Sequence, residues 1–295
     1  MSAVTVPLAA SRGESMLAQL ARKEIIRYAR HPLFLVGAAL VAVTSIQPPD
    51  PAMSSLSNVI APTTGIGLVG LLVMSSLTRS SDQIAESIGA SVVGERTRTL
   101  ALICALVVPF TAALMWLLWA IWAYRHFPAR PNGLPFGGVG DAWSYSTLVA
   151  LGLIPSLGGP ILGLVLSRWV RRRGAAPIFA VLVVAETIVM QGLFEPLRYL
   201  RNVAPWTYPG GPYGVPGDVN RMLIFTGSQQ WYSVYLLALC ALGAVLALLH
   251  DREQPRDKLV VALAVIAVVA ATTCVLSITT GIQAEMINPL PSGTP

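Results

Sequence analysis

The sequence predicts an all-α protein, a polytopic bundle of transmembrane helices. Of its 295 residues, 54% are hydrophobic and only 12% are charged, whereas a soluble domain carries about 25% charged residues. The apolar residues gather in seven stretches, most of them as long as the roughly 20 residues that a helix needs to cross a hydrocarbon core. These stretches are 33–46, 59–77, 100–124, 143–167, 175–194, 231–249 and 259–280. They use up the length, so no separate soluble domain is expected.

The distribution of basic residues predicts how the chain is oriented. Of the 20 Lys and Arg residues, 15 lie before the first stretch or after the second, fourth and sixth. The side with the basic excess faces the cytoplasm, so we expect a multi-pass protein of the bacterial plasma membrane with a cytoplasmic N-terminus. Seven spans would leave the C-terminal tail outside. Because the arginines lie at membrane borders and not on a folded face, the lipid bilayer is an expected partner and nucleic acid is not.

Residues 15–31, just before the first span, show the pattern of an amphipathic helix. The apolar face has spacings of three and four and comprises Leu17, Leu20, Ala21, Ile25 and Tyr28. Lys23, Arg27 and Arg30 fall on another face, and Pro32 disfavours helical geometry at the residue before it. An interfacial helix is the favoured interpretation, and the alternative is a basic flank that only anchors the topology.

The connection 78–99 is the longest one on the cytoplasmic side. It contains a short helical stretch, DQIAESI, in which Asp82 and Glu86 share a face, and it closes with Glu95, Arg96 and Arg98. This stretch is either a docking element for a soluble partner or an ordinary solvated loop, and the spacing does not decide between them. On the outer side, the loop 195–230 is rich in proline, glycine and aromatic residues, which favours an ordered cap.

Glu186 is the only acidic or basic residue near the middle of a span. An ionised carboxylate at that depth costs about 3 kcal/mol. Its role is either a proton or substrate site, or a neutral acid that is hydrogen-bonded to a neighbouring helix with Thr187 and Gln191 nearby. No second intramembrane charge exists to form a relay.

The patterns of soluble enzymes are missing. The sequence has no GxxxxGK[ST] motif for nucleotide phosphates. The three histidines are scattered at span borders, so no metal site is expected, and the three cysteines lie within apolar spans as small hydrophobic residues. We therefore expect no catalytic residue, no bound cofactor and no enzyme activity in this chain.

Two segments carry a family resemblance: ARKEIIRYARHPLFLVGAAL at 21–40 and ESIGASVVGERTRTLALICALVVPF at 86–110. With them, the chain resembles the permease subunit of an ABC transporter of the type-2 exporter superfamily, particularly those of high-GC Gram-positive bacteria. The segment 21–40 is similar to the family's cytoplasmic elbow helix, with Glu24, Arg27 and Arg30. The segment 86–110 is similar to its coupling helix, which docks on the ATPase subunit.

The resemblance implies alternating access in a dimer of two permeases, identical or different, driven by two ATPase subunits that bind ATP and Mg²⁺. It implies that the docking residues are Asp82, Glu86, Glu95, Arg96 and Arg98. It also implies three parts: residues 1–31 with the elbow helix, a six-span permease domain over 32–250, and 251–295. The family core has six spans, so the apolar stretch within the last part is an added seventh span and a departure from the family.

Three other functions fit less of the sequence. A proton-coupled secondary transporter or channel would use Glu186, but the chain shows no internal repeat. A membrane enzyme acting on lipid or peptide would need polar side chains converging at one depth. A non-transporting assembly or immunity subunit would keep the docking loop and would lack a pathway for a transported substrate.

Overall fold

The computed structural model describes residues 8–46, 59–87, 94–126, 141–170, 172, 174–190, 203–205, 213–214, 222–223, 227–251 and 255–281. Its main helices are α1 (Leu8–Ala29), α2 (Pro32–Ile46), α4 (Val69–Ser87), α5 (Glu95–Cys104), α6 (Val107–His126), α7 (Asp141–Leu148), α8 (Ile154–Trp169), α9 (Ala175–Ile188), α10 (Gln229–Leu249) and α11 (Asp257–Thr279). Shorter pieces are α3 (Ile60–Pro62), two π-helical segments, η2 (Thr63–Leu68) and η4 (Val149–Leu153), and a two-residue antiparallel pairing of β1 (Tyr213–Gly214) with β2 (Met222–Leu223). The predicted all-α helical bundle is confirmed.

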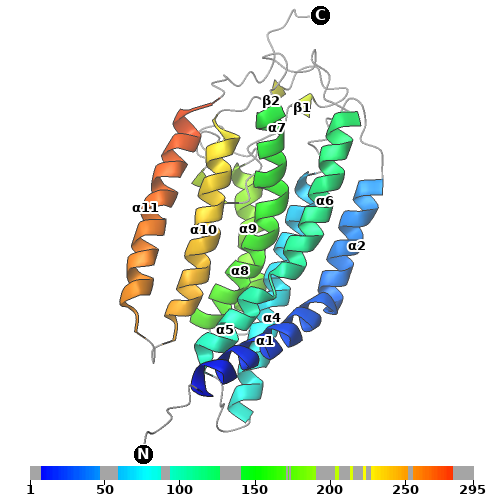
Figure 1. The fold of residues 1–295 in the computed structure, drawn as a ribbon. Helices are drawn as coiled ribbons and strands as arrows, with labels where there is room; N and C mark the ends of the chain where they lie inside the picture. The colour runs from blue at the N-terminus through cyan, green and yellow to red at the C-terminus, as the bar shows by residue number, and fades with distance from the viewer. Residues whose placement is uncertain are drawn as a thin grey trace, which may run out of the picture.

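The helices stand side by side and form one bundle (Figure 1). Five continuous helices are long and apolar enough to cross a membrane, and a bent pair made of α1 and α2 raises the number to six in the described part of the chain. The five are Ile60–Ile84, Glu95–His126, Asp141–Trp169, Gln229–Leu249 and Asp257–Thr279. The last of these is the predicted seventh stretch. α9 is apolar but has only 14 residues, fewer than the predicted 175–194, whose last residues lie outside the described part.

Helix α1 lies across one end of the bundle, which we call the α1 end (Figure 1). It meets α2 at an angle of 57°, at the Pro32 that the sequence marks as a breaker. Its buried residues Ala21, Glu24 and Tyr28 recur at spacings of three and four, so the face that packs on the bundle is the predicted apolar one with Glu24 added.

The structure differs from the sequence-based prediction between 78 and 99. α4 continues to Ser87 and α5 begins at Glu95, so residues 82–87 of DQIAESI form the end of a long helix and not a separate one. The physical reason is that no glycine or proline occurs between the apolar stretch and Gly89, so nothing ends the helix earlier. The charged close of the predicted loop is the first turn of α5.

At the centre of the bundle, the backbone of α8 lies in close contact with the backbone of α4 and of η2, which precedes α4. A Cβ atom added at Gly159 or Gly163 of α8 would overlap the carbonyls of Gly67 and Leu71. Small residues allow this approach in membranes because packing replaces the hydrophobic driving force. Ser167 adds a hydrogen bond of 2.8 Å to Ser75 across the same pair.

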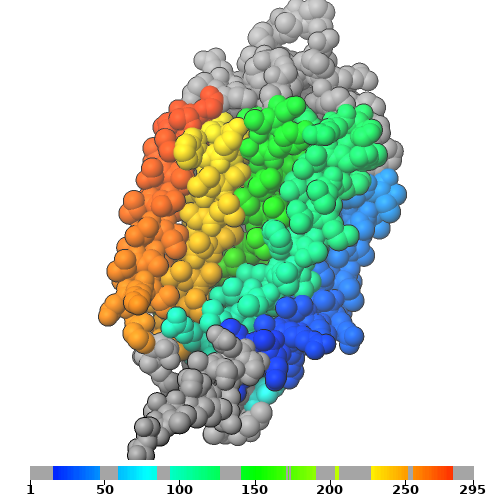
Figure 2. Space-filling model, viewed as in Figure 1, coloured from blue at the N-terminus to red at the C-terminus, as the bar shows by residue number. Residues whose placement is uncertain are grey.

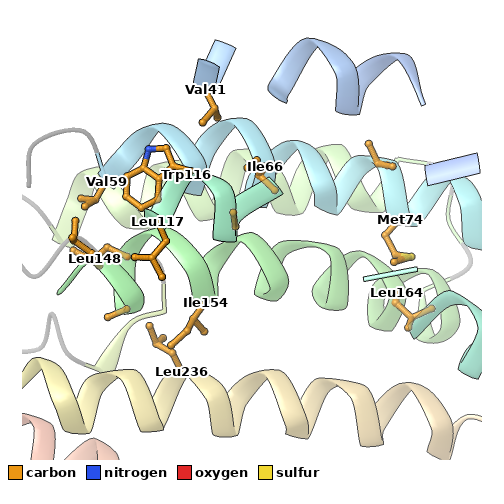
Figure 3. Packing of buried hydrophobic residues seen from close by; sticks show 14 of the residues in the cluster. Val41, Val59, Ile66, Met74, Trp116, Leu117, Leu148, Ile154, Leu164 and Leu236 are labelled. Atoms are coloured by element: carbon orange, nitrogen blue, oxygen red, sulfur yellow. The ribbon is translucent and has the colours of Figure 1, made fainter. Parts of the chain in front are cut away.

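Apolar side chains fill the space around this pair. Trp116 of α6 packs against Gly152, where a Cβ would overlap the indole ring, and Leu148, Ile154 and Leu236 belong to the same buried cluster (Figure 3). The edges of the bundle are less buried. α11 packs mainly on α10 and forms one edge of the surface, and α2 forms the opposite edge (Figure 2).

Candidate functional site

Charged side chains from four helices meet at the α1 end. The guanidinium of Arg168, in the last turn of α8, donates to both carboxylate oxygens of Asp82 on α4, at 2.7 and 2.9 Å. Arg98 of α5 donates to the same carboxylate at 3.3 Å. The Arg168 side chain is 2% exposed and the Asp82 side chain is 31% exposed. Both bonds come from Nη1, and charge-assisted hydrogen bonds of this kind are stronger than bonds between neutral groups.

Arg168 has a favourable position and an unmet hydrogen-bonding capacity. A cation in the last turn of a helix is stabilised by the helix dipole, and α8 ends one residue later, where Val170 is extended. Nε and Nη2 of Arg168 are buried and have no partner within the described ranges. Buried donors without acceptors carry a desolvation cost, so the Asp82 carboxylate is the main contact that offsets the burial of this charge.

Glu95 links the network to α10. As the first residue of α5 it lies where a helix dipole favours a negative charge. Its carboxylate contacts Nδ1 of His250, and the Arg168 guanidinium lies 3.8 Å away. Asp251 accepts a 3.2 Å hydrogen bond from the backbone N–H of Arg96. The end of α10 therefore closes over the first turn of α5.

A second contact ties α1 to α4. Glu24 accepts two hydrogen bonds from Arg27, at 2.7 and 2.9 Å, and Arg27 also donates to the hydroxyl of Ser80. Ser80 lies two residues before Asp82 on α4. Helix α1 is thus attached to α4, the helix that carries Asp82, whereas Arg30 is exposed.

Of the predicted docking residues, Asp82, Glu95 and Arg98 form contacts within the chain. Arg96 contributes only its backbone N–H to the contacts given above, and its side chain is partly exposed. Glu86 lies in the last turn of α4, and its side chain is outside the described part of the structure. Docking on a partner stays a prediction for all five residues.

Sequence reasoning missed three members of this site, Arg168, His250 and Asp251. The run of arginines after the fourth span was interpreted only as an orientation signal. A usable signal existed, because Arg168 precedes Trp169 and the rest of the run follows it. An arginine on the membrane side of an interfacial tryptophan must find a buried acceptor.

A second feature is a cavity of about 230 Å³ that is lined mainly by η2, η4 and α9. Thr187 lines this cavity together with Thr63 and Thr64, whereas the neighbouring Glu186 is half-buried and is not among the lining residues. Pro155 has no N–H, and the carbonyl four residues before it, that of Leu151, instead accepts a hydrogen bond from the hydroxyl of Thr63. The Thr63 hydroxyl therefore serves as a donor to the Leu151 carbonyl, which the N–H that Pro155 lacks cannot do.

Metal-binding geometry is not found in the described ranges: no group of three or more His, Cys, Asp or Glu side chains is placed to hold an ion. Comparisons with known proteins give no match to a family model, to a curated protein or to a solved structure. The charged network and its place on the bundle are therefore the features of the molecule that bear on its function.

Proposed function

We propose that this chain is the membrane-spanning permease subunit of an ATP-driven ABC transporter, an exporter that works with a separate ATPase subunit. The resemblance of 21–40 and 86–110 to the elbow and coupling segments of such permeases is the starting point. The observation that carries the proposal is the charged network, which joins the connection between α4 and α5 to the ends of α8 and α10.

The network supplies a means of transmission. A push on the α4–α5 connection acts directly on Asp82, Glu95 and Arg98, and these side chains hold Arg168 and His250 on the two neighbouring helices. Ion pairs that are partly excluded from water resist separation more than exposed ones. Closure of an ATPase dimer beneath this end would therefore move several helices together and not one loop alone.

The orientation agrees with this assignment. Basic side chains of the described residues are concentrated at the α1 end, and Arg125 lies at the opposite end of α6. By the positive-inside rule the α1 end faces the cytoplasm, where ATP is available to the partner. A second permease chain, identical or different, would complete the transporter, and ATP and Mg²⁺ would bind the ATPase subunits.

A charge-reversal test uses two of the predicted docking residues, Glu86 and Arg96. The double variant Glu86→Lys, Arg96→Glu inverts two charges of the connection and leaves Asp82, Glu95 and Arg98 unchanged. We expect an ATPase subunit that co-purifies with the wild-type chain to be lost from this variant. Lys23→Glu on α1 is the control and should retain the subunit. Unchanged retention in the double variant would show that this connection is not the docking site.

The second candidate is a proton-coupled secondary transporter that uses Glu186. It is favoured by one observation, the half-buried position of Glu186 on the apolar helix α9. This function predicts transport that needs no ATP and is abolished by Glu186→Gln. The permease proposal predicts that transport by Glu186→Gln persists and still requires ATP.

A further inference from the structure

A groove with only apolar lining runs along α10. It has a volume of about 310 Å³ and lies between α8 and α10, with Phe179 of α9 and Pro205 also in its wall. Typical contributors are Ile161 and Val165 of α8 and Leu239 of α10. The single side chain with a heteroatom among its lining residues is Cys240. Such a lining provides almost no hydrogen-bonding partner for a polar ligand and favours a hydrocarbon.

The groove is elongated. Along α10 it extends from Leu236 to Leu246, which corresponds to about 15 Å at the rise of an α-helix. That length is half of a hydrocarbon core about 30 Å thick. An apolar groove of this length therefore matches one hydrocarbon chain that reaches from the headgroup level to the middle of the bilayer.

The two ends of the groove differ. Near Leu236, the segment 203–205 covers the groove, held by hydrogen bonds from Tyr235 to the Val203 carbonyl at 2.6 Å and from Tyr232 to the Ala204 carbonyl at 2.9 Å. The other end points toward the α1 end. There the indole of Trp169 donates to the carbonyl of Leu246 at 3.1 Å and is 55% exposed. Tryptophan prefers the headgroup level of a bilayer.

We propose that the groove binds one acyl chain of a phospholipid from the leaflet at the α1 end, with the lipid headgroup at the level of Trp169. The chain length that the groove accepts, its apolar lining and its tryptophan-marked opening all fit this occupant. The bound chain would contact Phe179 and so would join α9, whose outer face is largely exposed, to α8 and α10. This site requires only that the helices lie in a membrane, and it does not depend on an ATPase partner.

The test is photocrosslinking of the full chain in vesicles of phosphatidylglycerol and phosphatidylcholine. The probe is phosphatidylcholine with a diazirine in the middle of one acyl chain, and crosslinked peptides are mapped by mass spectrometry. We expect crosslinks to concentrate on 154–165 and 236–246. The internal reference is the exposed face of α11, where Val261, Val265 and Val268 also meet lipid. Equal yields per residue on α11 and in the groove would overturn the proposal.

A matched pair of variants gives a second readout. Leu239→Trp fills the groove, and Leu237→Trp places the same indole on the same helix at a residue that is 50% exposed and does not line the groove. Leu239→Trp should lower the groove crosslink about fivefold, which corresponds to roughly 1 kcal/mol, and Leu237→Trp should leave it unchanged. Equal yields in both variants would contradict the site. So would a Cys240–Cys240 crosslink between two copies with no lipid label on the groove.

Discussion

Arg168 is the residue on which the α1 end depends most. It is an arginine that is almost completely buried, and its Nη1 lies within 2.9 Å of both oxygens of Asp82. Removing one partner of a buried pair leaves a charge without compensation, which costs about 3–5 kcal/mol, while exposed pairs are worth about 1 kcal/mol or less. Because Asp82 is partly exposed, the cost of losing this pair falls between these values.

Arg168→Gln is therefore expected to destabilise the protein by about 2 kcal/mol. The measurement is the thermal unfolding midpoint in mild detergent, which should fall by about 5 °C. Arg168→Lys keeps the charge but buries a more strongly hydrated ammonium group, so it should restore only part of the loss. If Arg168→Gln unfolds at the wild-type temperature, the network does not stabilise this end.

Thr63 and Thr64 provide a test of the Leu151 contact. Both side chains line the 230 Å³ cavity, but only Thr63 donates to the Leu151 carbonyl across the helix interface. Thr63→Val should lower the free energy of unfolding by an amount between about 0.6 and about 1.7 kcal/mol, the average and the maximum measured for hydrogen bonds between membrane helices. Thr64→Val removes a hydroxyl at the same cavity without breaking that bond and should be neutral. Chemical denaturation of both variants separates the two cases, and equal losses would argue against the bond.

Single residues were predicted from the sequence only in part. Glu186 was singled out as a charge within an apolar stretch, because depth can be counted along one helix, and its role stays a prediction. Asp82, Glu95 and Arg98 were also selected, but their contacts with Arg168 and His250 join residues up to 155 positions apart. Spacing along the chain carries no information about such long-range pairs, so their partners were missed.

At the scale of helices, glycine determines which helices approach most closely. Gly159 faces the carbonyl of Gly67, and a Cβ atom at this position would overlap backbone that cannot rotate away. Two helices in this arrangement must separate if either glycine gains a side chain. The pair formed by α4 and α8 is therefore the part of the bundle least able to accept larger residues.

Gly159→Ala should cost about 3 kcal/mol, at the upper end of the range for overpacking, despite the better helix propensity of alanine. Gly174→Ala is the control, because its Cβ would lie at an ordinary 3.8 Å from Ile178 Cδ1. Size-exclusion profiles and unfolding midpoints in detergent compare the two. A Gly159→Ala protein as stable as the Gly174→Ala protein would show that η2 and α8 are not held in contact here.

Helix positions were largely predictable, because a run of apolar residues in lipid must be helical to satisfy its backbone. The ends of helices were predictable where a proline or glycine interrupts the helix, as at Pro32. α4 extends about ten residues past its apolar run because 78–87 contains no such breaker. The two π-helical segments were not predicted, since prolines indicate that a bend occurs but not which hydrogen-bond register the backbone then takes.

At the scale of the whole molecule, topology links the structure to function. Substituted-cysteine labelling with a membrane-impermeant maleimide tests it in a chain whose three native cysteines are replaced. Lys23→Cys on α1 should react only from the cytoplasmic side, and Arg125→Cys at the opposite end of α6 only from outside. Labelling of both positions from the same side would contradict the bundle as a membrane-crossing unit, and the reversed pattern would contradict the orientation.

The proposal that the chain works as a permease subunit is tested most directly by identifying the proteins that co-purify with it. The measurement is affinity purification of the tagged full chain from its native membrane in mild detergent, with mass spectrometry and an ATP hydrolysis assay on the same sample. We predict a stoichiometric subunit with a P-loop and measurable hydrolysis. A chain that purifies alone and hydrolyses no ATP would contradict the proposal and would favour a carrier that uses Glu186.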